Sequence, residues 1–225
     1  ELDLERCILM GDSAGANIVH HVGCRFAREA GEEEAASAEA AAKLAKDPKL
    51  TLQAKKEMAG AGGHGCETGH AVPPHHHHHH HHHRMRMLAH VLLFPFFGGE
   101  EVTEAELRLK DAPLVDLENT SWCWRAFLPE GATREHHACN VLGPEGARIV
   151  SGLTLPPTLV AIGEYDGLKD WQVRYARDLH KLKKPVRVLY YRGGIHAFHL
   201  LSHQSMSSLI LSNLVTYIKS LLHSV

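Results

Sequence analysis

A short segment bounded by glycines, close to the first residue, has the composition of a nucleophile turn. Its sequence is Gly11-Asp12-Ser13-Ala14-Gly15, a G-x-S-x-G pattern between an apolar run and a helix-like segment. This pattern is typical of a serine nucleophile on a strained strand-to-helix turn. We expect a side chain at Gly11 or Gly15 to collide with the adjoining strand or helix, and the Ala14 N–H and the helix N-terminus to stabilise an oxyanion. The alternative is a glycine-rich turn whose serine only caps the helix.

A serine hydroxyl needs a base to take its proton and a carboxylate to orient that base. Asp166 lies in Gly163-Glu164-Tyr165-Asp166-Gly167, and His196 lies in Gly193-Gly194-Ile195-His196-Ala197-Phe198. Each follows an apolar run, and the order Ser, Asp, His is the one expected when the nucleophile lies on a strand-to-helix turn of this kind. Because parallel strands bring their carboxyl ends to one edge of a sheet, we expect Ser13, Asp166 and His196 to meet there.

Other acids and histidines lie near these motifs. Asp170 is expected in the first turn of the next helix, where a carboxylate favours the helix dipole, and Asp12 flanks the nucleophile. His199 could replace the predicted base only if the loop were longer than the sequence indicates. His20 and His21 lie two turns along the helix after Ser13, where packing or exposure to solvent is expected.

The elements that must position these residues follow from hydrophobic periodicity. Short apolar runs at 7–10, 88–94, 158–162 and 186–191 predict buried strands, and runs that are apolar on both faces favour parallel pairing. Helix-like spacing follows Ser13 as far as Arg28 and recurs in two later segments, which carry Leu168, Trp171, Tyr175, Leu179 and Leu182, and Ile210, Leu214, Tyr217, Ile218 and Leu221. The alternation predicts an α/β fold with a mostly parallel sheet flanked by helices.

We expect one partial domain over 1–225, interrupted by a low-complexity insert at 31–83. The insert holds only Leu44, Leu50, Leu52 and Val72 from the Val, Leu, Ile and aromatic set, too few for a core, so it is expected to be disordered apart from a solvated helix within 32–58. Nine consecutive histidines at 75–83 suit opportunistic metal capture, but low-complexity sequence supplies no fixed ligand set, so we predict a surface linker and no metal site.

Composition excludes several classes of protein. The chain has 24 Lys+Arg and 26 Asp+Glu, so no basic excess drives binding to nucleic acid or to anionic lipid. No apolar run reaches the 18 to 20 or so residues that a membrane span needs, and no leader is apparent. The 5 cysteines are scattered without a C-x-x-C pair, which favours a reducing cytoplasm. We expect no cofactor.

Several motifs together resemble the plant carboxylesterases of the hormone-sensitive-lipase-like branch of α/β-hydrolases, which includes the gibberellin receptor. The likeness covers nearly everything outside 31–83. It is carried by 11–17 with His20 and His21, by 94–101, by 122–138, by 166–172 and by 196–198. The resemblance implies an eight-stranded sheet of which this chain holds the last four strands. It also implies hydrolysis of a small carboxylic ester through an acyl-enzyme, with Ser13 as nucleophile, His196 as general base and acid, and Asp166 as its orienter.

One departure from that family concerns the oxyanion hole. The family carries an HGGG-type segment before the nucleophile, and no such segment occurs here, since Gly62-Gly63-His64-Gly65 lies after Ser13 in the insert. Loss of one oxyanion donor costs about a hundred- to a thousandfold in rate, so little catalysis is expected from this chain. It begins at Glu1 and resembles a piece whose first part is missing, which would expose the edge of the strand at 7–10 to self-association.

Two hypotheses remain besides that of an ester hydrolase. One is a hormone-type binding protein that uses the same pocket without turnover, and the other is an inert fragment. The receptor branch has lost the base, so the presence of His196 favours the hydrolase. Residues 114–141 are expected to form a partial cap, in which Trp122, Trp124, Phe127 and Leu128 serve packing more than ligand binding.

Overall fold

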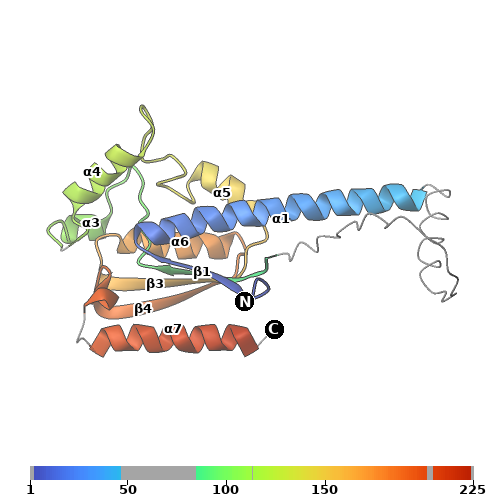
Figure 1. Ribbon diagram of the computed structural model, residues 1–225. Coiled ribbons are helices and arrows are strands. Elements are labelled where there is room, and N and C mark those ends of the chain that lie inside the picture. The colour runs from blue at the N-terminus through green and yellow to red at the C-terminus, as the bar shows by residue number, and fades with distance from the viewer. Residues whose placement is uncertain (1–2, 47–84, 113, 202–204, 224–225) are drawn as a thin grey trace, which may run out of the picture. The chain divides into compact units, whose positions relative to one another are not determined.

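The computed structural model describes residues 3–46, 85–112, 114–201 and 205–223. Within them one sheet is formed by β1 (Cys7–Asp12), β2 (Met87–Leu93), β3 (Thr158–Tyr165) and β4 (Val186–Ile195). The strands follow one another across the sheet in chain order, and every neighbouring pair is parallel. The predicted α/β fold with a parallel sheet is confirmed (Figure 1).

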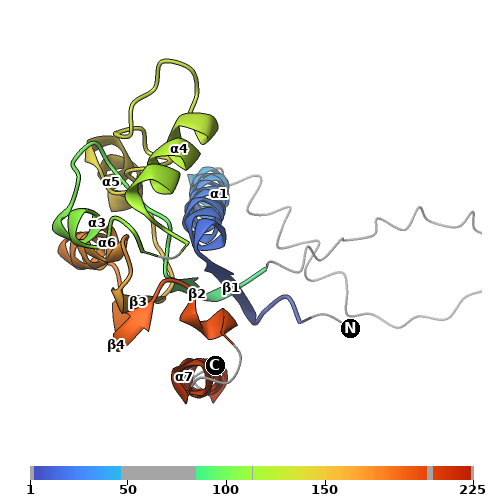
Figure 2. The same ribbon diagram turned by 90° about the vertical axis from the view of Figure 1, so that its left-hand side faces the viewer.

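Helices pack on both faces of the sheet, with α7 on one face and the part of α1 up to Arg28, α5 and α6 on the other (Figures 1 and 2). The helices are α1 (Ala14–Lys46), α3 (Glu104–Arg108), α4 (Leu117–Phe127), α5 (Pro144–Ser151), α6 (Lys169–Lys181) and α7 (Ser205–His223), with a short 3-10 helix at Phe198–Leu200. None of the helices in these ranges is long and apolar enough to cross a membrane.

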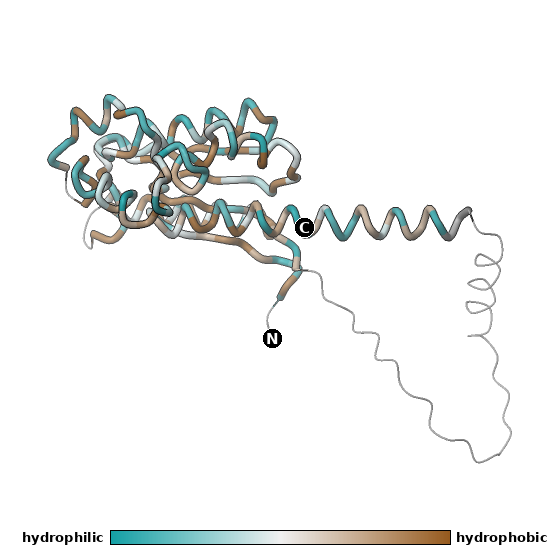
Figure 3. The backbone as a smooth tube through the Cα atoms, turned by 90° about the horizontal axis from the view of Figure 1, so that it is seen from above, coloured by the Kyte–Doolittle hydropathy of each residue, from teal (hydrophilic) through white to brown (hydrophobic). Residues whose placement is uncertain are grey.

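Alternate residues of the inner strands point into two separate cores. On β2, Leu92 packs into the core beneath α1 and α6, whereas Val91 and Leu93 pack into the core above α7. Both sides of β2 and most of β3 are buried, which explains why their sequences are continuous apolar runs. Along the helices hydrophobic and hydrophilic residues alternate, as expected where only one face is buried (Figure 3).

The chain divides into two compact units, Glu1–Arg28 with Arg84–Val225, and Glu29–His83. The helix whose apolar spacing runs as far as Arg28 continues to Lys46, so the helix expected within 32–58 is present over 32–46 as a continuation of α1. In the second unit the structure describes only 29–46, which are helical, and the side chains of 31–43 are exposed. The rest of the predicted insert, including the histidines at 75–83, lies outside the described residues, and its disorder stays a prediction.

The last strand is longer than its apolar run indicated. β4 continues through Gly193 and Gly194 to Ile195, which pairs with Tyr165 after a register shift in β3. The strands thus extend beyond the apolar runs at 158–162 and 186–191. A Cβ at Gly163 would lie 2.7 Å from the carbonyl oxygen of Gly194, so Gly163 lets β3 and β4 approach closely there. As a result, Asp166 and His196 each follow the last residue of a strand.

The expected packing role of the aromatic residues in 114–141 is correct only in part. Trp124 is buried on α4, and its ring lies 5.1 Å from that of Phe96. In contrast, Trp122 and Phe127 are 61% and 67% exposed. An α4 of eleven residues buries one face only, so these two rings are mostly exposed, although the Phe127 ring still lies 6.1 Å from that of Trp124.

Candidate active site

Ser13 lies between the last residue of β1 and the first residue of α1. Its φ angle is 51°, a left-handed conformation that costs a non-glycine residue on the order of 1 kcal/mol or more. Two backbone hydrogen bonds hold the turn: Ser13 N–H donates to the Leu93 carbonyl at 2.9 Å, and Phe96 N–H donates to the Ser13 carbonyl at 3.0 Å. The turn that carries the hydroxyl is therefore attached to the loop that leaves β2.

The two glycines of the G-x-S-x-G segment differ in what they allow. A Cβ at Gly11 would lie 2.4 Å from the carbonyl oxygen of Gly15, so the strand and the helix pass too closely for any side chain. At Gly15 the nearest atom to an added Cβ is Asp12 Oδ1 at 3.8 Å, an ordinary contact. The expected steric reason therefore holds for Gly11 and is wrong for Gly15 within the described residues.

His196 follows β4 directly and is 4% exposed. Its Nε2 atom lies 2.9 Å from Ser13 Oγ, and its Nδ1 atom lies 2.8 Å from Asp166 Oδ2. An ionised carboxylate can only accept hydrogen bonds, so Nδ1 carries the proton and Nε2 is free to accept one from the serine hydroxyl. The next residue, Ala197, has a φ angle of 52°, so the chain turns sharply after the imidazole.

Asp166 is fully buried directly after β3. Its Oδ1 atom accepts the Leu168 N–H at 2.8 Å, while Oδ2 accepts both His196 Nδ1–H and Gln172 Nε2–H, at 2.8 and 2.9 Å. Burial of a carboxylate is costly unless hydrogen bonds compensate the lost water, and these donors do so. Three residues far apart in the chain therefore form one hydrogen-bonded line from hydroxyl to carboxylate.

Backbone donors for a developing negative charge are available beside Ser13. Ala14 and Gly15 are the first two residues of α1, and N–H groups in the first turn of a helix have no partner within the helix. The helix dipole adds partial positive charge at the same place. An oxyanion formed on a carbonyl attacked by Ser13 could accept a hydrogen bond there.

The rival residues have other partners. Asp170 lies in the first turn of α6, as expected, and its Oδ2 atom accepts the Ala105 N–H at 2.8 Å, in α3. His199 Nε2 lies 3.6 Å from Asp12 Oδ2. His20 Nδ1 lies 3.0 Å from the Tyr175 hydroxyl in the core, and burial holds the pKa of His20 well below its ordinary value.

Sequence reasoning did not single out Gln172 as a partner of the site, although the 166–172 segment contains it. The signal was a polar residue on the otherwise apolar face of a helix: Gln172 lies one residue from Trp171, and both are buried. Phe94 was also missed, and its ring lies 6.1 Å from that of His196 in an edge-on arrangement.

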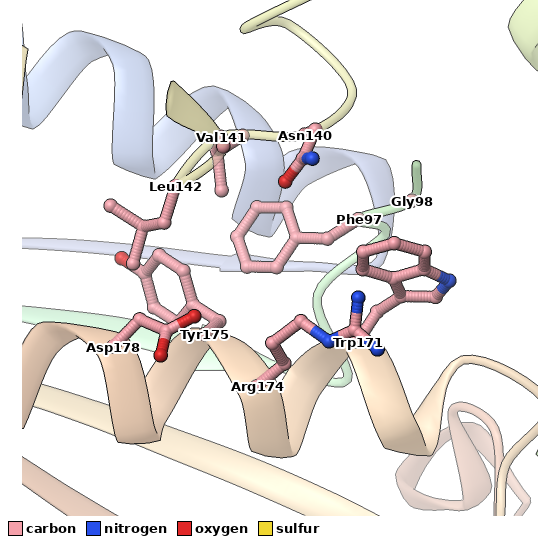
Figure 4. A pocket seen from close by; sticks show the side chains of 10 residues that line it. Phe97, Gly98, Asn140, Val141, Leu142, Trp171, Arg174, Tyr175 and Asp178 are labelled. Atoms are coloured by element: carbon pink, nitrogen blue, oxygen red, sulfur yellow. The ribbon is translucent and has the colours of Figure 1, made fainter. Parts of the chain in front are cut away.

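A separate small cavity lies along α6. Its volume is about 100 Å³, and Phe97, Trp171 and Tyr175 provide aromatic walls, with Arg174 and Asp178 also lining it (Figure 4). None of Ser13, Asp166 and His196 lines this cavity. In the described part of the chain, no cluster of three or more His, Cys, Asp or Glu side chains could hold a metal ion.

Comparison with known proteins places this arrangement in a family. A model of the alpha/beta hydrolase fold matches residues 1–200. The chain belongs to the α/β-hydrolase fold family. The nucleophile-turn motif, the parallel sheet and the chain order of Ser13, Asp166 and His196 are all consistent with this membership.

Curated relatives of this chain include plant proteins named as gibberellin receptors and as probable carboxylesterases. The chain is 36% identical to gibberellin receptor GID1C of Arabidopsis thaliana over 137 residues, which are 61% of this chain and 40% of the receptor. It is 27% identical to probable carboxylesterase 11 of the same plant over 197 residues, 87% of this chain and 32% of that protein. The chain therefore spans two fifths or less of the length of these relatives. The resemblance to plant carboxylesterases and gibberellin receptors is confirmed.

Solved structures share the fold of this chain. A structure from a study of two fungal esterases of Rhizomucor miehei has a TM-score of 0.63 at 18% identity, covering 99% of this chain and 53% of that one. The thermophilic carboxylesterase EstE1, cloned from a metagenomic library, has a TM-score of 0.61 at 19% identity, with 98% and 56% covered. At such low identity the likeness shows the fold alone.

Proposed function

We propose that this chain carries the triad of a carboxylic-ester hydrolase that acts on small acyl esters through an acyl-enzyme. The observation that carries the proposal is the position of His196, within 3 Å of both Ser13 Oγ and Asp166 Oδ2. A base in contact with both a hydroxyl and a buried carboxylate is the arrangement that activates a serine. The curated carboxylesterase relatives support the same class of reaction.

In the first half of the proposed reaction, His196 Nε2 takes the proton of Ser13 as Oγ attacks the ester carbonyl carbon. The tetrahedral oxyanion accepts the Ala14 N–H, and the imidazolium is stabilised by the buried Asp166 carboxylate. His196 then gives the proton to the departing alcohol, which leaves an acyl group on Ser13. Water, activated by the same imidazole, releases the acid and restores the serine.

The rate of this chain alone is expected to be low. The HGGG-type donors of the family are absent from the sequence, which leaves the N–H groups at the start of α1 as the oxyanion donors. Since each missing donor costs about a hundred- to a thousandfold, acylation by a reactive probe is a better first measurement than turnover.

The experiment is labelling of the chain with a fluorophosphonate, located by peptide mass spectrometry, alongside hydrolysis of p-nitrophenyl butyrate. We expect phosphonylation at Ser13, loss of labelling in Ser13→Ala, and unchanged labelling in Ser151→Ala, which alters an exposed serine on α5. Equal hydrolysis and equal labelling by the wild type and Ser13→Ala would contradict the nucleophile assignment.

A second candidate is a small-molecule binding protein that does not turn its ligand over. It is favoured by the relatives named gibberellin receptors, one of which is 36% identical to this chain. Calorimetric titration with a gibberellin tests it directly. Saturable binding that is the same in the wild type and Ser13→Ala, with no labelling of Ser13, would favour the binding protein over the enzyme.

The proposal places the protein in the cytoplasm and requires no metal or cofactor, because a serine, a histidine and a carboxylate suffice for the chemistry. The proposed cytoplasmic location is supported by the free thiols at Cys7, Cys24, Cys123 and Cys139. Such thiols persist in a reducing compartment. Cell fractionation of the tagged protein checks the location.

A further inference from the structure

We propose that Gln172 is a positioning residue of the triad, which orients the Asp166 carboxylate and disperses its charge through a neutral hydrogen bond. This inference rests on the proposed function, since it concerns the residue that orients the proposed base. Gln172 does not contact the serine; it acts through Asp166 and His196.

The contacts of Gln172 are specific to the site. Its side chain is fully buried, and Nε2 lies 2.9 Å from Asp166 Oδ2 and 3.4 Å from the Pro95 carbonyl oxygen. Phe96, the residue after Pro95, donates its N–H to the Ser13 carbonyl. One amide group therefore joins the carboxylate to the loop that holds the nucleophile turn.

The orientation of the amide follows from these acceptors. Both groups beside it, a carboxylate oxygen and a backbone carbonyl, can only accept hydrogen bonds, so the NH₂ end must face them. This orientation leaves the other end of the amide unpaired, because Gln172 Oε1 is buried with no hydrogen-bond partner among the described residues. A buried unpaired acceptor costs about 1 to 3 kcal/mol, so packing alone would favour an apolar side chain here.

Charge explains why a donor is useful at this place. In the described ranges Asp166 forms an ion pair with no Lys or Arg side chain, and His196 is its one ion-pair partner. The carboxylate must remain ionised while fully buried, so neutral N–H donors have to stabilise it. A donor shared with His196 on Oδ2 also moderates how strongly that oxygen stabilises an imidazolium.

Removing the donor should therefore strengthen the bond between His196 and Asp166. Gln172→Met keeps the length of the side chain and loses the N–H, while Gln172→Glu puts a second carboxylate beside Asp166. Leu179→Met is the matched control, because Leu179 is equally buried on α6, belongs to an apolar core cluster and has no polar atom to donate to Asp166. Volume-conserving changes of this kind are usually tolerated.

The measurement is NMR of the intact chain labelled in its histidine imidazoles. We expect the midpoint of the His196 titration to rise in the order wild type, Gln172→Met, Gln172→Glu, by about one pH unit or more in the last, with Leu179→Met unchanged. We also expect the Nδ1–H resonance to move downfield in the same order. A midpoint in Gln172→Met that equals those of the wild type and Leu179→Met would overturn the proposal.

A second measurement needs no variant, and it tests the positioning role of Gln172 even if Gln172→Met or Gln172→Glu unfolds. In the wild type, one side-chain amide proton of Gln172 should lie downfield of free glutamine and should change with pH together with the His196 imidazole. A Gln172 amide resonance at the chemical shift of free glutamine, unchanged as the His196 imidazole titrates, would contradict the positioning role of Gln172. Absence of phosphonylation at Ser13 would instead reject the proposed hydrolase activity. The NMR results test the contact between Gln172 and Asp166 independently of that activity.

Discussion

His199 Nε2 lies 3.6 Å from Asp12 Oδ2, so the residue before the predicted nucleophile pairs with the third residue after the predicted base. The His199 ring also stacks on Phe94, with centroids 5.5 Å apart. His196, by contrast, faces Ser13. Two histidines on one loop therefore have different partners, and only one of them is in a position to accept the hydroxyl proton.

The first prediction separates these two histidines. His196→Gln should slow phosphonylation of Ser13 by about a hundredfold or more, since it removes the general base. His199→Gln should change the rate by less than about tenfold, because the pair with Asp12 is half exposed on the carboxylate side and weak. The check is the second-order labelling rate at pH 8; a larger loss in His199→Gln than in His196→Gln would reverse the assignment.

The second prediction compares the two glycines of the turn. Gly11→Ala should destabilise the fold by about 1 to 3 kcal/mol, because the new Cβ meets backbone atoms of Gly15 that cannot move without shifting α1. Gly15→Ala should be neutral or stabilising, since its space is open and alanine favours a helix by about 1 kcal/mol over glycine. Urea unfolding measures both, and equal losses would refute the steric account.

The third prediction concerns acid stability. Burial lowers the pKa of His90 from its ordinary value of 6.5 to about 4. The neutral ring is therefore favoured in the folded state, and its contribution is complete above pH 6.5. As the pH falls from 6.5 to 4 the unfolded chain binds a proton that the folded chain does not, so the free energy of unfolding decreases by about 3 kcal/mol.

The check on this prediction is urea unfolding at several pH values between 7 and 4 in the wild type and in His90→Leu. The variant removes the titrating ring while keeping an apolar group against Gly23, so its curve should be flatter in this window. His20, whose pKa burial also lowers, should leave a residual slope in the variant. Parallel curves would show that His90 is accessible to protons in the folded state.

The fourth prediction addresses self-association. β1 lies at one edge of the described sheet, pairs there with β2 alone, and carries Met10, which is 55% exposed. The opposite edge strand, β4, carries exposed Arg187 and Arg192, and charges of this kind discourage edge pairing. We therefore propose that oligomers form through β1.

Sedimentation velocity at several concentrations should show oligomers of the wild type and a shift toward monomer in Met10→Lys. Val188→Lys, on β4, is the matched control, since Val188 is also an exposed apolar residue on an edge strand. A shift toward monomer in Val188→Lys alone would indicate that the interface lies on β4. A wild type that sediments as a monomer at every concentration would contradict self-association.

Much of the architecture could be predicted from the sequence because burial leaves a local pattern. Continuous apolar runs at β2 and β3 indicated strands covered on both sides, and the position of Asp166 and His196 after such runs indicated one sheet edge. Strand and helix ends were less predictable. β4 continues through Gly193, whose φ angle is 73°, and through Gly194, and only the pairing of Ile195 with Tyr165 shows this.

The sequence by itself determined the order Ser13, Asp166, His196, the need for a small residue at Gly11, and the parallel sheet, since each follows from residue type and spacing. Only the tertiary structure decided that His196 rather than His199 faces the serine, that Gln172 donates to Asp166, and that a Cβ at Gly15 would meet no close neighbour. The physical reason is that hydrogen bonds depend on separations of a few tenths of an ångström. Those separations are set when distant strands close into one sheet, not by the spacing of residues along the chain.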